Sequence, residues 1–357
     1  MSLQADLMHP EFGYFDERLN LTELTTYEKS DLPFGIAQTL HPVAYRSKIF
    51  LELENEHIWT RDWVAIGLTH EIKSSGDLLP FTVGFHGIHV QRLPNKSIQA
   101  RFNRHQHGGC RFVPVQCRTG KQTKCTIASC NYTRDAPAMK ASKEGGNSDE
   151  MYKFLGLVPE KLRDVAYTTI GPVIFVNVNP QCLPLSDDFE ITNALSEGWR
   201  ENDNIDVKFE WQDHSCNWKL FGKEFMREAL WDNPPAWRYP NLLNGQIGAT
   251  NVIAILQSTG PGNTLVRCFV SGGSPEDLKA ALKQLQIIGS AASQEQIELS
   301  NWNTSSRPET IGSTLPTETN KAAYEMHRYL ITRVTAVHEQ FGNAPIMDAR
   351  MLQRGRG

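Results

Sequence analysis

The sequence lacks the features that would define a membrane-spanning or nucleic-acid-binding protein. It has no apolar run near the ~18 residues that a membrane-spanning helix needs, and it has no long basic run. Its formal net charge is -4, which argues against a partner held through phosphate contacts. The first residues include neither a basic segment nor an apolar one, so we expect no secretory signal and a cytoplasmic location.

The cysteine count also disfavours a disulfide framework. Seven cysteines, an odd number, occur in a chain of 357 residues. In a large chain without a secretory signal, this pattern is more typical of free thiols and metal ligands. We expect Cys182, Cys216 and Cys268 to be thiols in the core.

Histidine is absent from two long windows. The chain has eleven histidines, but none lies between His107 and His214 or between His214 and His327. By contrast, the short segment 103–135 holds two histidines and four cysteines, which are His105, His107, Cys110, Cys117, Cys125 and Cys130. Such a density of ligands usually indicates a metal centre.

Length and composition predict two domains behind an N-terminal arm. The chain is 40% hydrophobic and 21% charged, as in globular proteins, and it is long enough for two cores. The polar, irregular residues 1–40 are interpreted as an arm that lies on another surface. We place the first domain at 41–180 and the second at 181–357.

The pattern of the first domain predicts a helix followed by a small antiparallel sheet. Tyr45, Ile49 and Leu53 recur at near-helical spacing, which predicts a helix continuing to Trp59. Short apolar runs separated by turns then predict strands between residues 63 and 102. Residues 165–178 are typical of a buried strand that returns to the same sheet.

The second domain is predicted to combine strands with four helices. Predicted strands lie at 206–212, 251–258 and 263–272, and predicted helices at 187–199, at 216–231, from Ser274, and at 318–340. Ser274 is a good start because Ser caps, Pro275 takes the first helical position and acids fill the first turn. We expect Lys219 and Lys223 to be solvated or paired with nearby acids, and His327 and His338 to face solvent.

Short signatures follow one another in a consistent order between residues 30 and 230. They are Tyr45, Ser47, Phe50 and Glu52; Ile58-Trp59 and Trp63; Ala65 and Gly67; Gly76-Asp77; Asn103; Ile174-Phe175-Val176-Asn177; and Asn217-Trp218-Lys219-Leu220. With these signatures the chain resembles the alpha subunit of Rieske non-haem iron oxygenases, close to the choline- and carnitine-monooxygenase-like branches. The resemblance implies an α+β fold. A Rieske-like antiparallel β domain would precede a helix-grip (START-like) α/β domain with a curved antiparallel sheet and a long C-terminal helix.

The resemblance implies two metal sites, and the first has lost ligands. The family holds a [2Fe–2S] cluster with C-x-H on one loop and C-x-x-H on another. His107 and Cys125 match a histidine and a cysteine of that pattern, but His105 stands at the other cysteine position. Ala128 stands at the last histidine position and cannot bind metal. Residues 103–135 therefore look like degenerate cluster loops.

The second site would be a mononuclear iron held by two histidines and a carboxylate. The resemblance places these histidines shortly after Asn217-Trp218-Lys219-Leu220, where this chain has none. Glu224, Glu228 and Asp232 offer only carboxylates. We therefore expect neither an intact [2Fe–2S] cluster nor a mononuclear iron.

These losses predict a non-catalytic, alpha-like subunit, a pseudo-enzyme. Family members assemble as trimers or heterohexamers, so the resemblance implies that such a copy would support an intact homologous alpha subunit. It would shape the active site or the reductase-docking face of its partner, within a Rieske-type mono- or dioxygenase complex. No nucleic-acid or membrane partner is expected.

Three alternatives stay open. His105, His107, Cys125 and Cys130, with Cys110 and Cys117 in reserve, form a credible tetrahedral Zn²⁺ set or an altered cluster. The second domain alone would make a small-molecule binding module with Trp218, Phe225 and Trp231 around a cavity, although aromatics at this spacing are more often plain core. An enzyme with Cys110 as nucleophile beside His107 is the weakest, because no oriented acid is identifiable.

Overall fold

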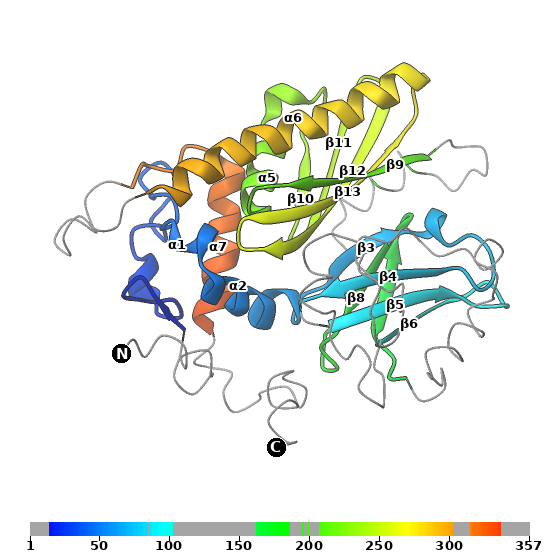
Figure 1. Cartoon of the computed structure of the whole chain (residues 1–357), viewed down its shortest axis with the longest axis horizontal. Helices are drawn as coiled ribbons and strands as arrows, with labels where there is room; N and C mark the ends of the chain where they lie inside the picture. The colour runs from blue at the N-terminus through cyan, green and yellow to red at the C-terminus, as the bar shows by residue number, and fades with distance from the viewer. Residues whose placement is uncertain are drawn as a thin grey trace.

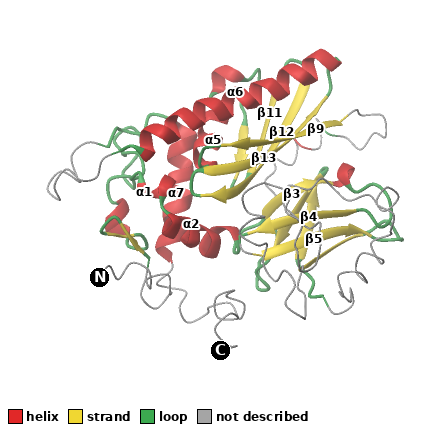
Figure 2. Ribbon diagram, viewed as in Figure 1, coloured by secondary structure: helices red, strands yellow, loops and turns green. Residues whose placement is uncertain are grey.

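The structure of the protein is a computed structural model that describes residues 14–84, 86–102, 162–185, 195, 199, 207–302 and 315–336. A helical region, a large sheet crossed by one long helix, and two small sheets make up the described chain (Figure 1). Helices and strands occur mostly in separate runs along the chain, as expected of an α+β protein (Figure 2).

The predicted N-terminal helix is present but divided. It comprises α1 (Val43–Arg46), α2 (Lys48–Glu54) and a π-helical turn (Asn55–Trp59). Ser47 has extended backbone angles, and its side chain accepts a hydrogen bond from the Phe50 backbone N–H at 3.1 Å. This serine ends α1 and caps α2, because its hydroxyl satisfies an N–H group that the helix leaves without a partner.

Two small antiparallel sheets follow, where the sequence predicted a single one. One has the order β3 (Val64–Leu68), β8 (Val173–Asn177), β7 (Ala166–Ile170), and the other β4 (Leu78–Val83), β5 (His86–Arg92), β6 (Ile98–Phe102). The single strand predicted at 165–178 is instead the hairpin of β7 and β8. Gly171 turns the chain at φ 52°, a left-handed conformation that favours glycine.

The larger sheet is five-stranded and wholly antiparallel among the described strands. Its order is β10 (Ala236–Arg238), β11 (Leu242–Ile247), β12 (Thr250–Gly260), β13 (Asn263–Ser271), β9 (Val207–His214). Helix α6 (Pro275–Ser300) lies across one face of this sheet (Figure 1). Ser274 caps α6 and Asp277 completes the capping box, so the predicted start is confirmed.

Two further helices fill the space between α6 and the N-terminal region. They are α5 (Trp218–Phe225) and α7 (Lys321–Thr335), which contact one another. One pair of very short strands, β1 (Phe15–Asp16) and β2 (Leu19–Asn20), and a 3-10 turn (Leu24–Tyr27) precede them. The N-terminal residues pack on this chain's own C-terminal part, since Gln38 bridges Thr317 and Asp31 pairs with Arg328.

A buried arginine joins the large sheet to the small ones. Arg267 of β13 is fully buried and donates to the carbonyl oxygens of Ile66 and Pro80 at 3.1 and 3.3 Å. Its guanidinium lies 4.5 Å from the Phe81 ring centre and 4.4 Å from that of Trp211. Hydrogen bonds and cation–π contacts together compensate the charge for its burial.

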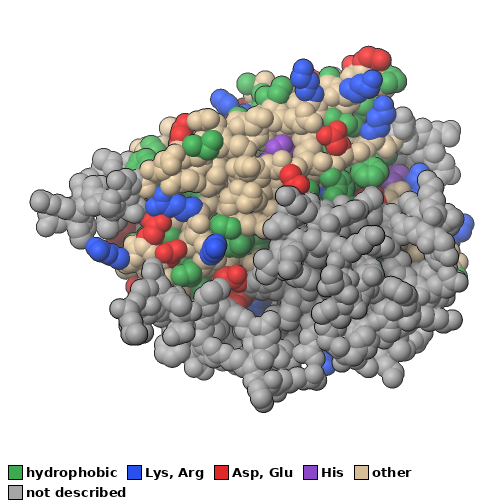
Figure 3. Space-filling view, in the orientation of Figure 1, with side chains coloured by type: hydrophobic (Ala, Val, Ile, Leu, Met, Phe, Trp, Pro, Cys, Tyr) green, Lys and Arg blue, Asp and Glu red, His purple; other side chains and the backbone are tan. Residues whose placement is uncertain are grey.

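Charged side chains of both signs are mixed on the described part of the face that Figure 3 shows. In Figure 3, Lys, Arg, Asp and Glu side chains are interspersed over α6 within the part of that face that is described. None of the described helices is long and apolar enough to cross a membrane.

Candidate functional site

Helix α5 begins at the Asn217-Trp218-Lys219-Leu220 signature, and hydrogen bonds hold its start in place. The Asn217 side-chain oxygen accepts from the Lys219 backbone N–H at 3.1 Å and so caps the helix. The Asn217 amide donates to the carbonyl oxygen of Pro261 at 2.6 Å. The asparagine thus ties the start of α5 to the turn between β12 and β13.

A buried ion pair lies in the first turn of α5. The Lys219 ammonium contacts the Glu54 carboxylate of α2 at 2.5 Å, and both side chains are almost completely buried. Burial raises the pKa of Glu54 and lowers the pKa of Lys219, while the charge of each partner opposes the shift of the other. The alternative that Lys219 is solvated is wrong, and its acid lies 165 residues away in sequence.

Aromatic rings surround this ion pair. The Lys219 ammonium lies 5.4 Å from the ring centres of Tyr45 and Phe50 and 5.1 Å from that of Trp218. A desolvated cation gains energy from aromatic faces at such distances. The site therefore keeps a charge in the core with one carboxylate and three rings as its environment.

The chain that follows α5 folds back on the helix through two tryptophans. Trp237 of β10 lies so close to Gly222 that a Cβ there would approach its ring to 2.1 Å. Trp231 lies on Gly245 of β11 in the same way, with 2.5 Å between its ring and an added Cβ. These two positions require glycine because the indoles occupy the space of a side chain.

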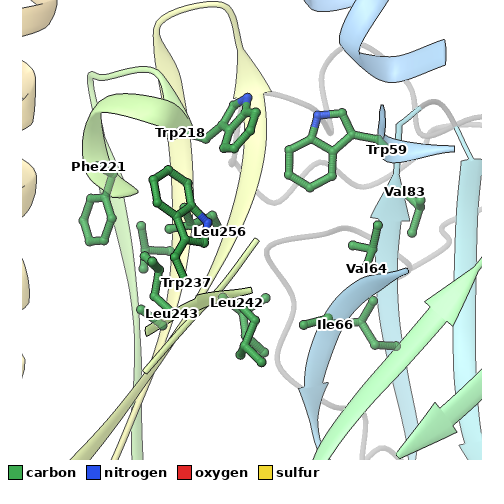
Figure 4. Close-up of a cluster of buried hydrophobic side chains, with 14 of the residues drawn as sticks. Trp59, Val64, Ile66, Val83, Trp218, Phe221, Trp237, Leu242, Leu243 and Leu256 are labelled. Atoms are coloured by element: carbon green, nitrogen blue, oxygen red, sulfur yellow. The ribbon is translucent and has the colours of Figure 1, made fainter. Parts of the chain in front are cut away.

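The tryptophans extend a continuous aromatic cluster. The ring centres of Trp59 and Trp218 are 5.5 Å apart, and those of Trp218 and Trp237 are 6.1 Å apart, both edge to face (Figure 4). The Phe225 and Trp231 rings lie 4.3 Å apart. Trp218, Phe225 and Trp231 are buried members of the hydrophobic core.

The carboxylates in this region point to different partners. Glu224 pairs with Arg227 at 3.0 Å, and the Asp232 side chain accepts from the Gly248 backbone N–H. Glu228 is exposed in a 3-10 turn. No histidine lies between His214 and His327 in the sequence. A mononuclear iron with two histidines and a carboxylate therefore does not fit the residues present around α5.

His214, the histidine that precedes this window, is half-buried between α5 and α6. Its ring centre lies 5.2 Å from that of Phe221, and an added Cβ at Gly289 of α6 would approach its ring to 2.1 Å. Burial lowers the pKa of His214 to about 4. The imidazole is therefore neutral at physiological pH and wedged between α5 and α6.

His327 of α7 does not face solvent, and that prediction was wrong. Its side chain is 1% exposed, and Nε2 lies 3.1 Å from the Tyr45 hydroxyl. Burial, followed by the charges of Lys223 and Lys219, lowers the pKa of His327 to about 3. The neutral ring lies beside Glu318, whose Oε2 is 3.9 Å from its Nδ1.

The three cysteines that the structure describes are free thiols. Cys216 and Cys268 are buried, as predicted, and burial raises the pKa of Cys216 to about 12. The expectation that Cys182 is a core thiol was wrong, because it is only half-buried in the loop after β8. Buried thiols with raised pKa values are poor nucleophiles and poor ligands.

The predicted metal ligands lie outside the described residues. They are His105, His107, Cys110, Cys117, Cys125 and Cys130, and His338 lies outside as well. Within the described ranges, no group of three or more His, Cys, Asp or Glu side chains is placed to hold a metal ion. For the cluster site the test is therefore the donor set itself, in which His105 and Ala128 do not match a [2Fe–2S] cluster of this type.

Sequence reasoning missed Glu54, the partner of Lys219. A signal for it exists, since Glu54 lies four residues after Phe50 and four before Ile58, both buried. That spacing places a carboxylate on the apolar face of a helix, where it needs a buried partner. The partner itself could not be identified, because nothing local connects α2 to α5.

Comparisons with known proteins find relatives in sequence and in fold. No protein-family model matches the chain. It is 30% identical over 206 residues to the glycine betaine monooxygenase oxygenase subunit of Chromohalobacter salexigens, covering 57% of this chain and 43% of that protein. It is 26% identical over 180 residues to the subunit of the same name from Pseudomonas aeruginosa, covering 49% and 40%. The matched region thus spans less than half the length of either relative.

Solved structures share the fold over most of the chain. A quaternary ammonium Rieske monooxygenase matches with a TM-score of 0.58 and 12% identity, covering 87% of this chain and 98% of that one. A naphthalene 1,2-dioxygenase bound to phenanthrene matches with a TM-score of 0.57 and 13% identity, covering 89% and 96%. Another structure of the quaternary ammonium monooxygenase concerns carnitine oxidation and inter-subunit electron transfer. The chain therefore has the fold of Rieske oxygenase alpha subunits and resembles such subunits in sequence over about half of its length.

Proposed function

We propose that this protein is a non-catalytic, alpha-like subunit that supports an intact homologous alpha subunit in a Rieske-type oxygenase complex. The observation that carries the proposal is the region after α5. There the chain keeps the Asn217 cap and the Lys219–Glu54 pair, yet Trp231 and Trp237 fill the neighbouring space and no histidine is present. The scaffold is kept while the donors are lost.

A supporting subunit needs only its fold and its contact surfaces. Partner binding stabilises the bound form by mass action, whether or not the partner carries a metal of its own. The complex would be a cytoplasmic trimer or heterohexamer in which this chain shapes the active site or the reductase-docking face of the intact subunit. The names of the relatives make glycine betaine and carnitine the first substrates to assay with the complex.

Co-expression with an intact homologue tests this proposal. The homologue carries the full C-x-H and C-x-x-H pattern and a different affinity tag, and native mass spectrometry measures the composition of the purified complex. We expect a mixed oligomer whose oxygenase activity per intact subunit exceeds that of the homologue alone. A chain that remains separate from every intact alpha homologue of its own genome would contradict the proposal.

A second candidate function is metal binding by the Cys/His segment. The observation that favours it is the ligand density, since His105, His107, Cys110, Cys125 and Cys130 lie within 26 residues of sequence. Two nitrogens and two thiolates suit tetrahedral Zn²⁺. Metal analysis would detect zinc in the wild-type protein and its loss in Cys125→Ser, whereas Cys182→Ser, outside the segment, would keep it. Zinc absent from the wild type, or unaffected by Cys125→Ser, would contradict this candidate.

A further inference from the structure

A cavity of about 310 Å³ lies between the C-terminal end of α6, the start of α7 and the segment before α1. Its volume is within the range of small-molecule sites. The side chains that matter for its chemistry are Tyr45, Lys223, Glu295, Glu298, Trp302 and Glu318. They come from four separate parts of the sequence, so the cavity forms only when these parts fold together.

The charges around this cavity are unbalanced toward the acidic side. Lys223 contacts Glu295 at 2.7 Å, which pairs the one lysine with one of the three glutamates. Among the described residues, neither Glu298 nor Glu318 has an ion pair with a lysine or arginine. Two carboxylates therefore line the cavity without a basic side chain of their own.

Glu318 sits at the buried inner wall of the cavity. It is 3% exposed, and its Oε1 accepts from the Asn320 backbone N–H at 2.9 Å. Burial raises its pKa, and the Asn320 N–H and the Lys223 charge only partly oppose that shift. A carboxylate in this position gains strongly from a cation that brings N–H donors.

An unpartnered buried nitrogen lies next to Glu318. His327 Nδ1 has no hydrogen-bond partner within the described structure and lies 3.9 Å from Glu318 Oε2. The His327 side chain is 1% exposed, so leaving this nitrogen unpaired costs energy. The imidazole does not itself line the cavity, so Glu318 is the group of this pair that a ligand would contact.

The geometry disfavours a metal ion and favours an organic cation. Within the described residues, the glutamates of the cavity do not converge into a group that could hold a metal. Trp302 is 37% exposed, and together with Leu299 and Pro316 it gives the cavity an apolar wall. Methylene groups pack on such a wall, and an ammonium gains from a tryptophan face.

We propose that this cavity binds a small protonated diamine. One ammonium donates to Glu318 at the inner wall, the methylene chain lies against Trp302, and the second ammonium neutralises Glu298 near the mouth. Because the Glu318 carboxylate accepts hydrogen bonds, primary ammonium groups are preferred over fully methylated ones. The inference is independent of the metal content of the protein and of its partner.

Calorimetric titration of the full-length protein with 1,4-diaminobutane tests the proposal. We expect saturable binding, weakened about tenfold or more by Glu318→Gln or Glu298→Gln, because each removes a charge-assisted contact. Glu276→Gln is the matched control, since Glu276 is exposed at the opposite end of α6. Glu298 is itself exposed, so its variant keeps the test valid if Glu318→Gln does not fold.

Three results would overturn the proposal. One is the absence of saturable binding at millimolar 1,4-diaminobutane in the wild-type protein. Another is equally tight binding of the permethylated diamine, which has no N–H donors. The third is equal weakening in the Glu276→Gln control, which would indicate only a general response to net charge.

Discussion

The two ends of α5 differ in what holds them. Its start is polar, with the Asn217 cap and the buried Lys219–Glu54 pair, whereas the chain after its end is packed by Trp231 and Trp237. The polar end belongs to a signature shared with the family that the chain resembles. The segment with Trp231 and Trp237 contains no histidine, because none lies between His214 and His327.

The contacts that hold α5 in place thus involve other residues than those that would bind iron. The charged pair joins α2 to α5 and sets the position of the helix, while the tryptophans occupy space that no metal ligand uses in this chain. We therefore expect that removing the Lys219–Glu54 contact lowers the free energy of unfolding strongly. Changes to the carboxylates at the other end are then nearly silent.

The largest effect is expected from Lys219→Met. This change leaves the Glu54 carboxylate buried without a partner, which typically costs about 3–5 kcal/mol of unfolding free energy. Lys223→Met is the control, because the Lys223–Glu295 pair is partly exposed and should contribute less than about 1 kcal/mol. Urea unfolding measures both.

A double variant sharpens this test. Lys219→Met with Glu54→Leu removes both charges, so it should be less destabilising than Lys219→Met alone. Additive losses would show that the two side chains act independently, contrary to the ion pair at 2.5 Å.

The aromatic end is tested by Gly222→Ala. An added Cβ would approach the Trp237 ring to 2.1 Å, so overpacking should cost about 1–3 kcal/mol in urea unfolding. In a Trp237→Leu background the same change should cost less, because the indole is no longer in contact. An unchanged cost in both backgrounds would locate the strain elsewhere.

His327 predicts a pH dependence of stability. Its folded pKa of about 3 lies below the ordinary value of 6.5, so the unfolded chain binds the proton first. Its contribution is present above pH 6.5 and is lost as the pH falls toward 3, at about 1.4 kcal/mol per pH unit. His327→Gln should flatten the stability curve between pH 6 and 4 by that slope, as followed by urea unfolding. Parallel curves would contradict a buried neutral histidine.

The smallest effect is expected from Glu224→Gln at the far end of α5. Its pair with Arg227 involves an arginine that is 60% exposed, so the change should stay within about 0.5 kcal/mol. Urea unfolding measures the change, and a loss of more than about 1 kcal/mol would contradict the assignment of this pair as a solvated one.

Local sequence signals predicted the fold well where the cause is local. The start of α6 was identified from Ser274 and Pro275 because capping depends on neighbouring residues. Three of the five strands of the large sheet, β9, β12 and β13, followed from apolar runs and turns, whereas β10 and β11 were not predicted. Helix α5 was predicted too long, since Trp231 has the right spacing for the helix but folds back to donate to the Phe225 carbonyl oxygen.

The candidate site depends on contacts that the sequence does not encode locally. Tyr45 and His327 are 282 residues apart, and no periodic pattern reveals that the histidine faces a hydroxyl rather than water. The missing histidines, by contrast, were visible at once, because an absent side chain needs no structure to detect. The resemblance itself rested on ordered short motifs that preserve the scaffold.

The most direct test of the central claim is the iron and acid-labile sulfide content of the purified chain, measured together with its visible and electron paramagnetic resonance spectra. Expression under iron-replete, anaerobic conditions gives any cluster a fair chance to form. The account predicts no stoichiometric iron, no labile sulfide and no Rieske-type spectrum. A full [2Fe–2S] cluster, or a stoichiometric mononuclear iron bound by this chain alone, would contradict it.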